Sequence, residues 1–185
     1  MKKYLIKIGA SVFLLFLMLT WNGCDQFNHL PLNIPFTLNV SVSGSDNTLS
    51  DTSDPFCITS DSQTYSDYQD KIRSLHFVEA AFRTISVTPA DLSGDITVTL
   101  LDGDGNEIFR YVIPNATPAD YLKPNSPYIL HLRQEQIDFI NSYLDQLLNT
   151  GACFSASFTV ENISGQPPYH IDGAIDMVIE ADTEF

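Results

Sequence analysis

The chain has 185 residues, and 44% of them are hydrophobic, including twelve Phe and eight Tyr. This content of large apolar residues excludes an intrinsically disordered chain and is enough for a substantial core. The formal net charge of −14 argues against direct binding to nucleic acid or to anionic lipid headgroups, because phosphate groups would be repelled.

The first residues have the pattern of an export signal. Lys2, Lys3 and Lys7 precede an apolar run over residues 8–19. A run of about a dozen apolar residues is too short to cross a bilayer as a mature helix and is typical of a secretory signal. We therefore predict a signal peptide over residues 1–23. The remaining 162 residues would keep six basic and all twenty-three acidic side chains, a net charge of −17.

The junction Gly23-Cys24 resembles that of bacterial lipoproteins, in which a small residue and a cysteine close the signal and the cysteine receives diacylglycerol. Trp21 and Asn22 stand where those proteins usually carry Leu and then Ala or Ser. The resemblance implies lipidation of Cys24 and a lipid-anchored place in the bacterial cell envelope, with the outer membrane favoured over the inner membrane and the leaflet left open. The alternative is an ordinary signal peptide with Cys24 free.

Residues 24–35 are expected to be a tether between the lipid anchor and the folded part. Asn28, Pro31, Asn33 and Pro35 interrupt any periodic pattern there. Residues 36–185 are then expected to form one β-sandwich domain.

Period-two alternation of apolar and polar residues predicts strands through most of this domain. The four clearest segments are 36–42, 96–100, 154–160 and 171–179. Weaker candidates are 56–59, which lies among loops rich in Ser, Asp and Thr, and 74–87, 107–113 and 128–132. Segment 74–87 could begin as a helix, and a bulge near Ala80 and Ala81 would make it one strand.

One strong helix is predicted over residues 133–149. Its apolar residues recur at intervals of three and four, at Ile137, Ile140, Leu144, Leu147 and Leu148. Gly151 is placed to end the helix.

These elements predict a mainly β fold, an antiparallel β-sandwich of about seven or eight strands with this amphipathic helix closing an edge or an end. The Pro-rich connection 114–127 would carry the chain between the sheets. Together with the signal, this arrangement resembles uncharacterised bacterial lipoproteins with an immunoglobulin-like or jelly-roll sandwich. The resemblance is architectural and implies no activity.

A weak candidate for a calcium site lies in the segment 102–107, where Asp102, Asp104 and Asn106 alternate with other residues. The sixth position is Glu107, where an EF-hand requires glycine. Asp-Gly repeats between two alternating runs are also typical of a hairpin turn, which is our preferred interpretation.

Catalytic signatures are not found in the sequence. The four histidines have no spacing typical of a zinc pair, and no serine lies in a Gly-x-Ser-x-Gly motif. His170 and Asp172 are expected to form a polar pair on the outer face of the last strand. Asp172 and Asp176 share that face at a distance of about 13 to 14 Å, which is too far for paired catalytic carboxylates. We predict no catalytic residues, no metal site and no cofactor, and the ligand-binding residues stay unidentified.

Cys57 and Cys153 are the thiols that remain if Cys24 carries lipid, and we predict a disulfide between them in an oxidising compartment. The alternative is two separate buried cysteines.

The function predicted from these features is a membrane-anchored, non-catalytic binding or scaffolding module that contacts an envelope protein or a glycan. The alternatives are a structural accessory subunit of an envelope complex, and a polysaccharide or peptide hydrolase without a recognisable motif. No Trp follows the signal, so sugar stacking would depend on tyrosines such as Tyr65, Tyr68, Tyr121 and Tyr169, with Tyr169 expected to be the most exposed.

Overall fold

The computed structural model describes residues 29–151 and 153–184. The predicted signal peptide over residues 1–23 and the predicted lipidation site, Cys24, lie outside the described residues. Both therefore stay predictions.

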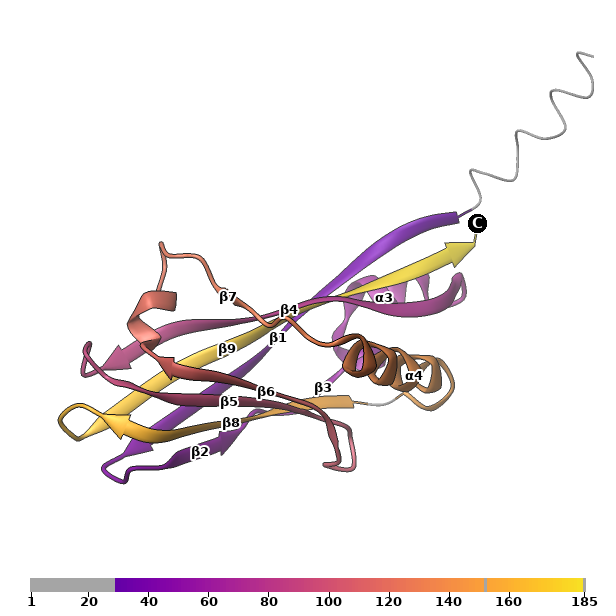
Figure 1. Ribbon diagram of the computed structural model, residues 1–185. Helices are drawn as coiled ribbons and strands as arrows, with labels where there is room; N and C mark the ends of the chain where they lie inside the picture. The colour runs from indigo at the N-terminus through magenta and orange to yellow at the C-terminus, as the bar shows by residue number, and fades with distance from the viewer. Residues whose placement is uncertain (1–28, 152, 185) are drawn as a thin grey trace, which may run out of the picture.

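Nine strands in the described part of the chain form two antiparallel sheets packed face to face (Figure 1). The first sheet has the order β1-β9-β4-β7, and the second has the order β2-β8-β5-β6, with β3 also paired to β8. The strands are β1 (His29–Gly44), β2 (Leu49–Thr52), β3 (Phe56–Cys57), β4 (Ile72–Thr88), β5 (Ser93–Leu101), β6 (Glu107–Ala116), β7 (Tyr128–Ile129), β8 (Cys153–Ser164) and β9 (Tyr169–Glu184).

The strand pairs are nested along the chain. β1 pairs with β9, β2 with β8, β4 with β7 and β5 with β6, so the chain is folded back on itself and then wrapped into two sheets. This is the topology of a jelly roll. The predicted antiparallel β-sandwich is confirmed, and the nested pairing favours the jelly roll over the immunoglobulin-like alternative. The strand that the sequence analysis missed is β2.

The core lies between the sheets and is built from the alternating residues that the sequence pattern identifies. On β8, for example, Phe154, Ala156, Phe158 and Val160 are all fully buried. Two aromatic pairs join the sheets: the rings of Phe36 and Phe154 stack at 5.7 Å, and those of Phe82 and Phe158 at 5.4 Å. Each such side chain stabilises the fold by about 1.5 to 3 kcal/mol through burial.

Strand β1 begins at His29, so the prediction of an irregular tether through residue 35 is wrong for residues 29–35. This segment pairs with the end of β9 in continuous register. The backbone N–H of Ser41 donates to Asp51, away from β9. In a strand, the backbone nitrogens of every second residue point to the same side. The nitrogens of Pro31 and Pro35 therefore also face away from β9. Proline is tolerated on an edge strand at such positions, since no ladder hydrogen bond is lost.

Strand β4 is confirmed as one long strand, and the bulge predicted near Ala80 and Ala81 lies two residues earlier, at Val78. Its register against β9 shifts between Ile72 and Ser74, between Phe77 and Glu79, and between Thr84 and Ser86. Two of the inserted residues, Val78 and Ile85, are 52% and 48% exposed. The extra residue of a bulge interrupts the alternation of inward and outward side chains, which explains why these apolar side chains lie at the surface.

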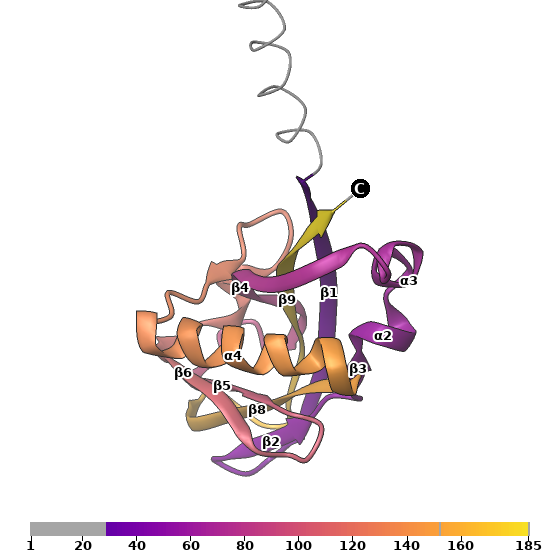
Figure 2. The same ribbon diagram turned by 90° about the vertical axis from the view of Figure 1, so that its right-hand side faces the viewer.

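The helix α4 (Gln134–Thr150) closes the open side of the sandwich, where it packs against β4 and β6 (Figure 2). The prediction of a helix over 133–149 is confirmed. Ile140 and Leu144 are fully buried, and Gly151 adopts a φ of +69° just beyond the last turn. The connection after β6 contains the short helix η2 (Pro118–Tyr121) and passes from the second sheet to the first, as predicted.

Two short helices occupy part of the segment predicted to be loops around a strand at 56–59. They are α2 (Ile58–Asp61) and α3 (Gln63–Tyr68), and the strand is reduced to Phe56–Cys57. The hydroxyl of Ser62 caps α3 by accepting the N–H of Tyr65. None of the helices in the described part combines the length and apolar character needed to cross a membrane.

Candidate functional site

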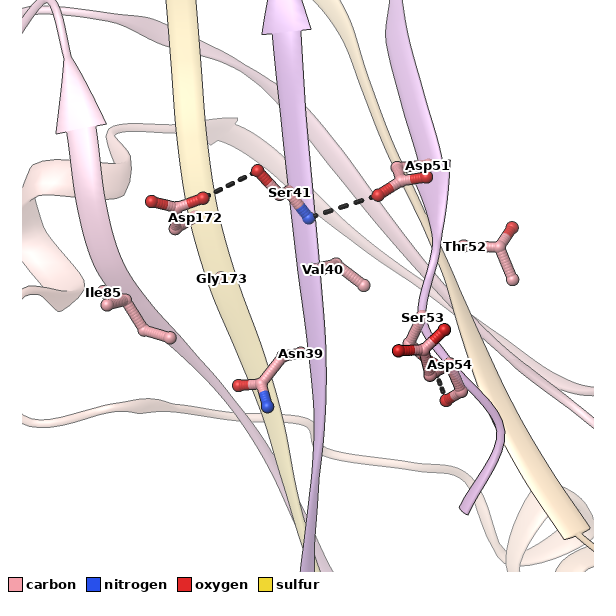
Figure 3. Close-up of a pocket in the computed structure, with 10 residues that line it drawn as sticks. All are labelled: Asn39, Val40, Ser41, Asp51, Thr52, Ser53, Asp54, Ile85, Asp172 and Gly173. Carbon is pink, nitrogen blue, oxygen red and sulfur yellow. Dashed lines mark hydrogen bonds between the residues drawn. The ribbon is translucent and has the colours of Figure 1, made fainter.

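A hollow of about 340 Å³ lies on the outer face of the first sheet, where β1 and β9 pass the end of β2. We call it the β1–β2 pocket (Figure 3). Its floor is formed by β1, β9 and the bulge of β4, and its wall by residues 51–54. Its lining includes the side chains of Asn39, Ser41, Thr52, Asp54, Ile85 and Asp172. The volume lies at the lower end of the range for small-molecule sites, about 300 to 1,000 Å³.

Asp172 is the centre of a hydrogen-bond network beside this pocket. The hydroxyl of Ser41 donates to its Oδ1 at 2.7 Å, the hydroxyl of Ser86 donates to its Oδ2 at 2.6 Å, and His170 Nε2 lies 2.9 Å from Oδ2. Hydrogen bonds from Ser86, Ser41 and His170 hold the pKa of Asp172 below its usual range. The carboxylate is therefore a fixed, ionised acceptor.

This network does not have the geometry of a hydrolytic triad. A triad places histidine between serine and aspartate, so that the imidazole can take the serine proton. Here His170 and the two serines all contact Asp172, and within the described residues no hydrogen bond joins His170 to either serine. Neither serine is activated as a nucleophile by this arrangement.

The wall of the pocket is held rigidly by Ser53. Its buried hydroxyl donates to the carbonyl oxygen of Asp54 and accepts the N–H of Ala156 on β8, each at 2.9 Å. The side chains of Asn39, Thr52 and Asp54 are exposed and make no side-chain hydrogen bond to other described residues. Among the polar side chains that line the pocket, the unpaired ones are therefore one amide, one hydroxyl and one carboxylate, beside the half-exposed side chain of Ile85.

The predicted disulfide is confirmed. Cys57 and Cys153 are bonded and join β3 to the start of β8, where the two cysteines are also partners in the strand register.

The segment 102–106, which contains the weak calcium candidates, is a hairpin turn between β5 and β6. Asp102 Oδ1 accepts the N–H groups of Asp104 and Asn106, and its Oδ2 accepts the side-chain amide of Asn106. Gly105 supplies the positive φ, +84°, that the turn requires. The carboxylate of Asp102 therefore organises the turn. Among the described residues, no group of three or more His, Cys, Asp or Glu is placed to hold a metal ion.

The expectation that Tyr169 is exposed is wrong. Tyr169 is 7% exposed and its hydroxyl donates to the carbonyl oxygen of Gly165, and Tyr65 is buried to the same degree. Neither ring is available to stack on a sugar, whereas Tyr68 and Tyr121 are partly exposed. His170 and Asp172 form the outer-face pair that was predicted. Asp176, on the same face, bonds instead with Arg83 at 3.0 Å.

The other pocket residues were missed because they belong to no motif. Asn39 lies on a predicted strand, and its outward position follows from the alternation of β1. The approach of residues 51–54 depends on the pairing of β2 with β8, and the outward turn of Ile85 depends on a bulge. Neither can be read from local sequence.

No protein-family model and no curated protein matches the chain. Among solved structures, the chain is similar to those of tobacco necrosis virus (10% identity, TM-score 0.42, 85% of this chain and 97% of that chain) and Desmodium yellow mottle tymovirus (9% identity, TM-score 0.39, 85% and 89%). A third is the infectious bursal disease virus VP2 subviral particle (9% identity, TM-score 0.41, 81% and 32%). These likenesses are too distant to carry an argument about function, and the fold assignment rests on the strand pairing.

Proposed function

We propose that this chain is a lipid-anchored protein of the bacterial cell envelope whose β-sandwich is a non-catalytic binding module. The anchor is supported by the three lysines and apolar run before Gly23-Cys24, and by the resemblance of that junction to bacterial lipoproteins. Two or three acyl chains on Cys24 would hold the protein firmly to a membrane.

The observation that carries the proposal is the position of the β1–β2 pocket on the strand that follows the anchor. Four residues, 25–28, separate Cys24 from His29, where β1 begins. Asn39 lies ten residues farther along β1, a distance of about 34 Å. The paired ends of β1 and β9 reach past the body of the sandwich (Figure 1). They would act as a rigid spacer that presents the pocket away from the membrane.

The binding role is supported over the two alternatives by specific contacts. Asp172 is ionised and hydrogen-bonded to two serines, which does not suit a general acid or an activated serine hydrolase. Pro31 and Pro35 on the edge of β1 hinder the addition of a strand from a complex partner. The partner would be an envelope protein or a glycan, and the net charge of −17 after the signal disfavours nucleic acid.

Lipid attachment can be tested with Cys24→Ala. The wild-type protein should incorporate a palmitate analogue and sediment with membranes, whereas the variant should be unlabelled and released in folded form. Unlabelled wild-type protein in the soluble fraction would contradict the anchor.

The binding surface can be tested with a photo-crosslinking amino acid placed at Asn39 or, as a control, at Asn33. Both residues are exposed on β1, but only Asn39 lines the pocket. In intact envelopes, position 39 should give one discrete adduct and position 33 should not. Equal adducts at both positions, or none at position 39, would contradict this surface. Saturable turnover of a chromogenic glycoside, ester or peptide, lost in Asp172→Asn, would support the hydrolase alternative instead.

A further inference from the structure

A second hollow, of about 420 Å³, lies on the outer face of the second sheet. We call it the hydroxyl hollow. The side chains that define its chemistry are those of Thr97, Thr99, Ser157, Thr159, Arg110 and Glu161. It involves neither the lipid anchor nor the β1–β2 pocket, so an inference about it goes beyond the proposed function.

The strand register arranges the hydroxyl groups in two rows. Thr99 lies between Arg110 on β6 and Ser157 on β8, and Thr97 lies between Val112 and Thr159 in the same way. Val98 and Leu100 are fully buried between the sheets, so Thr97 and Thr99 point outward. Neighbouring strands are about 4.8 Å apart, and residues two apart on a strand are separated by about 6.8 Å. The floor is a regular grid of hydroxyl groups.

Thr99 is the group that points to a ligand. It is 7% exposed, yet its hydroxyl has no hydrogen-bond partner among the described residues. Buried polar groups normally have a partner. On the first sheet even the exposed Thr37 has a partner, since its hydroxyl donates to Asp176. The side chain of Thr99 is therefore more than nine-tenths buried at the floor of the hollow, and its hydroxyl, which keeps some access to solvent, has a hydrogen bond left to make.

The charges around the hollow favour a neutral ligand. Arg110 is engaged by Glu107 at 2.9 Å, and Glu161 adds a second carboxylate at the rim. Glu107, Glu161 and Arg110 together carry a net charge of −1, so an anionic ligand would be repelled. The floor of Thr and Ser side chains carries no charge, so a ligand would be held there by hydrogen bonds and not by an ion pair. Hydroxyl groups both donate and accept hydrogen bonds, and the threonine methyl groups offer small apolar contacts. From this combination we propose that the hydroxyl hollow binds a neutral oligosaccharide.

The test uses the full chain in a detergent without a sugar headgroup. Maltotriose, cellotriose, mannotriose and xylotriose are titrated separately at millimolar concentrations and followed by calorimetry. At least one should bind saturably. Thr99→Val should weaken that binding by roughly tenfold, the effect of one unmade hydrogen bond in a shielded site. Its melting temperature should not fall, because the hydroxyl bonds to nothing in the folded chain.

Thr88→Val is the matched control, since Thr88 is an exposed threonine on the first sheet and should leave binding unchanged. The acidic trisaccharide trigalacturonate should not bind. The proposal is overturned if none of the four neutral trisaccharides binds, if Thr99→Val binds them as the wild type does, or if trigalacturonate binds equally well. Asn39→Ala, which alters only the β1–β2 pocket, should bind the trisaccharide normally, so failure at one site can be told from failure at the other.

Discussion

The outer faces of the two sheets use their polar side chains in different ways. On the first sheet, acids of β9 are bonded to neighbouring strands: Asp172 to Ser41 and Ser86, Asp176 to Thr37 and Arg83, Asp182 to Ser74, and Glu184 to Arg73. The second sheet differs. No hydrogen bond joins a described residue to the hydroxyl groups of Thr97, Thr99, Ser157 and Thr159. The acids of the first face are bonded to neighbouring strands, whereas the hydroxyl groups of the second face are left unpaired.

The cause lies in which residues the register places side by side. β9 runs between β1 and β4, so each of its acids has a neighbour on either side, and β4 supplies Arg73, His76 and Arg83. β5 and β8 instead present uncharged hydroxyl groups to one another, and short hydroxyl side chains on adjacent strands need not bond. The strand register therefore leaves the hydroxyl groups of the second face free to bond to water or to a ligand.

The disulfide belongs to the second sheet alone, and its removal should cause the largest loss of stability. Replacing Cys57 and Cys153 together by Ala removes a crosslink across 96 positions of sequence and should lower the free energy of unfolding by about 4 to 5 kcal/mol in the chain-entropy model. Urea unfolding of the two proteins measures this difference. A loss below about 1 kcal/mol would contradict the chain-entropy account of the crosslink.

The next effect concerns the helix that closes the gap between the sheets. Leu144 lies on the inner side of α4 and is fully buried, and Leu144→Ala should lower the free energy of unfolding by about 2 to 4 kcal/mol. Phe139 lies on the same helix and is 55% exposed, so Phe139→Ala is the matched control and should cost less than about 1 kcal/mol. Equal losses in urea melts would show that α4 is not anchored by its buried side.

Features set by local pattern were predictable from the sequence, and features set by distant pairing were not. The alternation of β8, the apolar stripe of α4 and the position of Gly151 all follow from residues close together in the chain. β2 escaped notice because only Leu49 of its four residues is buried, which is too little for a periodic signal. Cys57 and Cys153 could be paired by elimination, without any knowledge of the register.

The errors over β1 and the candidate pocket have the same origin. Pro31 and Pro35 were interpreted as breaks because proline usually ends a strand, but their nitrogens face the free edge of β1. Which edge is free depends on β9, more than a hundred residues away. The same long-range pairing brings residues 51–54 beside Asn39 and turns Ile85 outward, so the pocket could not be derived from either segment alone.

A smaller effect should appear in acid, where the bonded carboxylates of the first face lose their contacts. Burial opposes ionisation of Asp176, but hydrogen bonds from Arg83 and Thr37 lower its pKa below the usual value, and the pKa of Asp172 is also lowered. Since the folded-state pKa values lie below those of the unfolded chain, this stability is present above about pH 4 and is lost as the pH falls further. Both side chains are about one-third exposed, so solvent screening limits the combined effect to roughly 1 to 2 kcal/mol.

Asp176→Asn tests this assignment because it removes one of the two titrating groups. The wild type should lose stability between about pH 4 and pH 2, and the variant should lose less over the same interval. Melting temperatures recorded across that interval give the comparison. An unchanged acid dependence in the variant would mean that the contacts of the first face are not what acid disrupts.

The smallest effect concerns Thr84, which shares with Thr99 a hydroxyl without a partner but lies in a different place. Thr84 is on β4 and 1% exposed, and its Oγ1 is the one fully buried side-chain oxygen or nitrogen among the described residues that lacks a hydrogen bond. An unpaired hydroxyl sealed in a core destabilises the fold, and an apolar group of the same shape removes that cost. Thr84→Val should therefore raise the free energy of unfolding by about 0.5 to 1 kcal/mol and leave trisaccharide binding unchanged. Thr99→Val should instead weaken trisaccharide binding without lowering the stability of the fold. Urea melts and the calorimetric titration, run on both variants, separate the two threonines. A destabilised Thr84→Val protein would show that the hydroxyl has a partner in solution, such as a buried water, and that the core of the first sheet is not dry at that point.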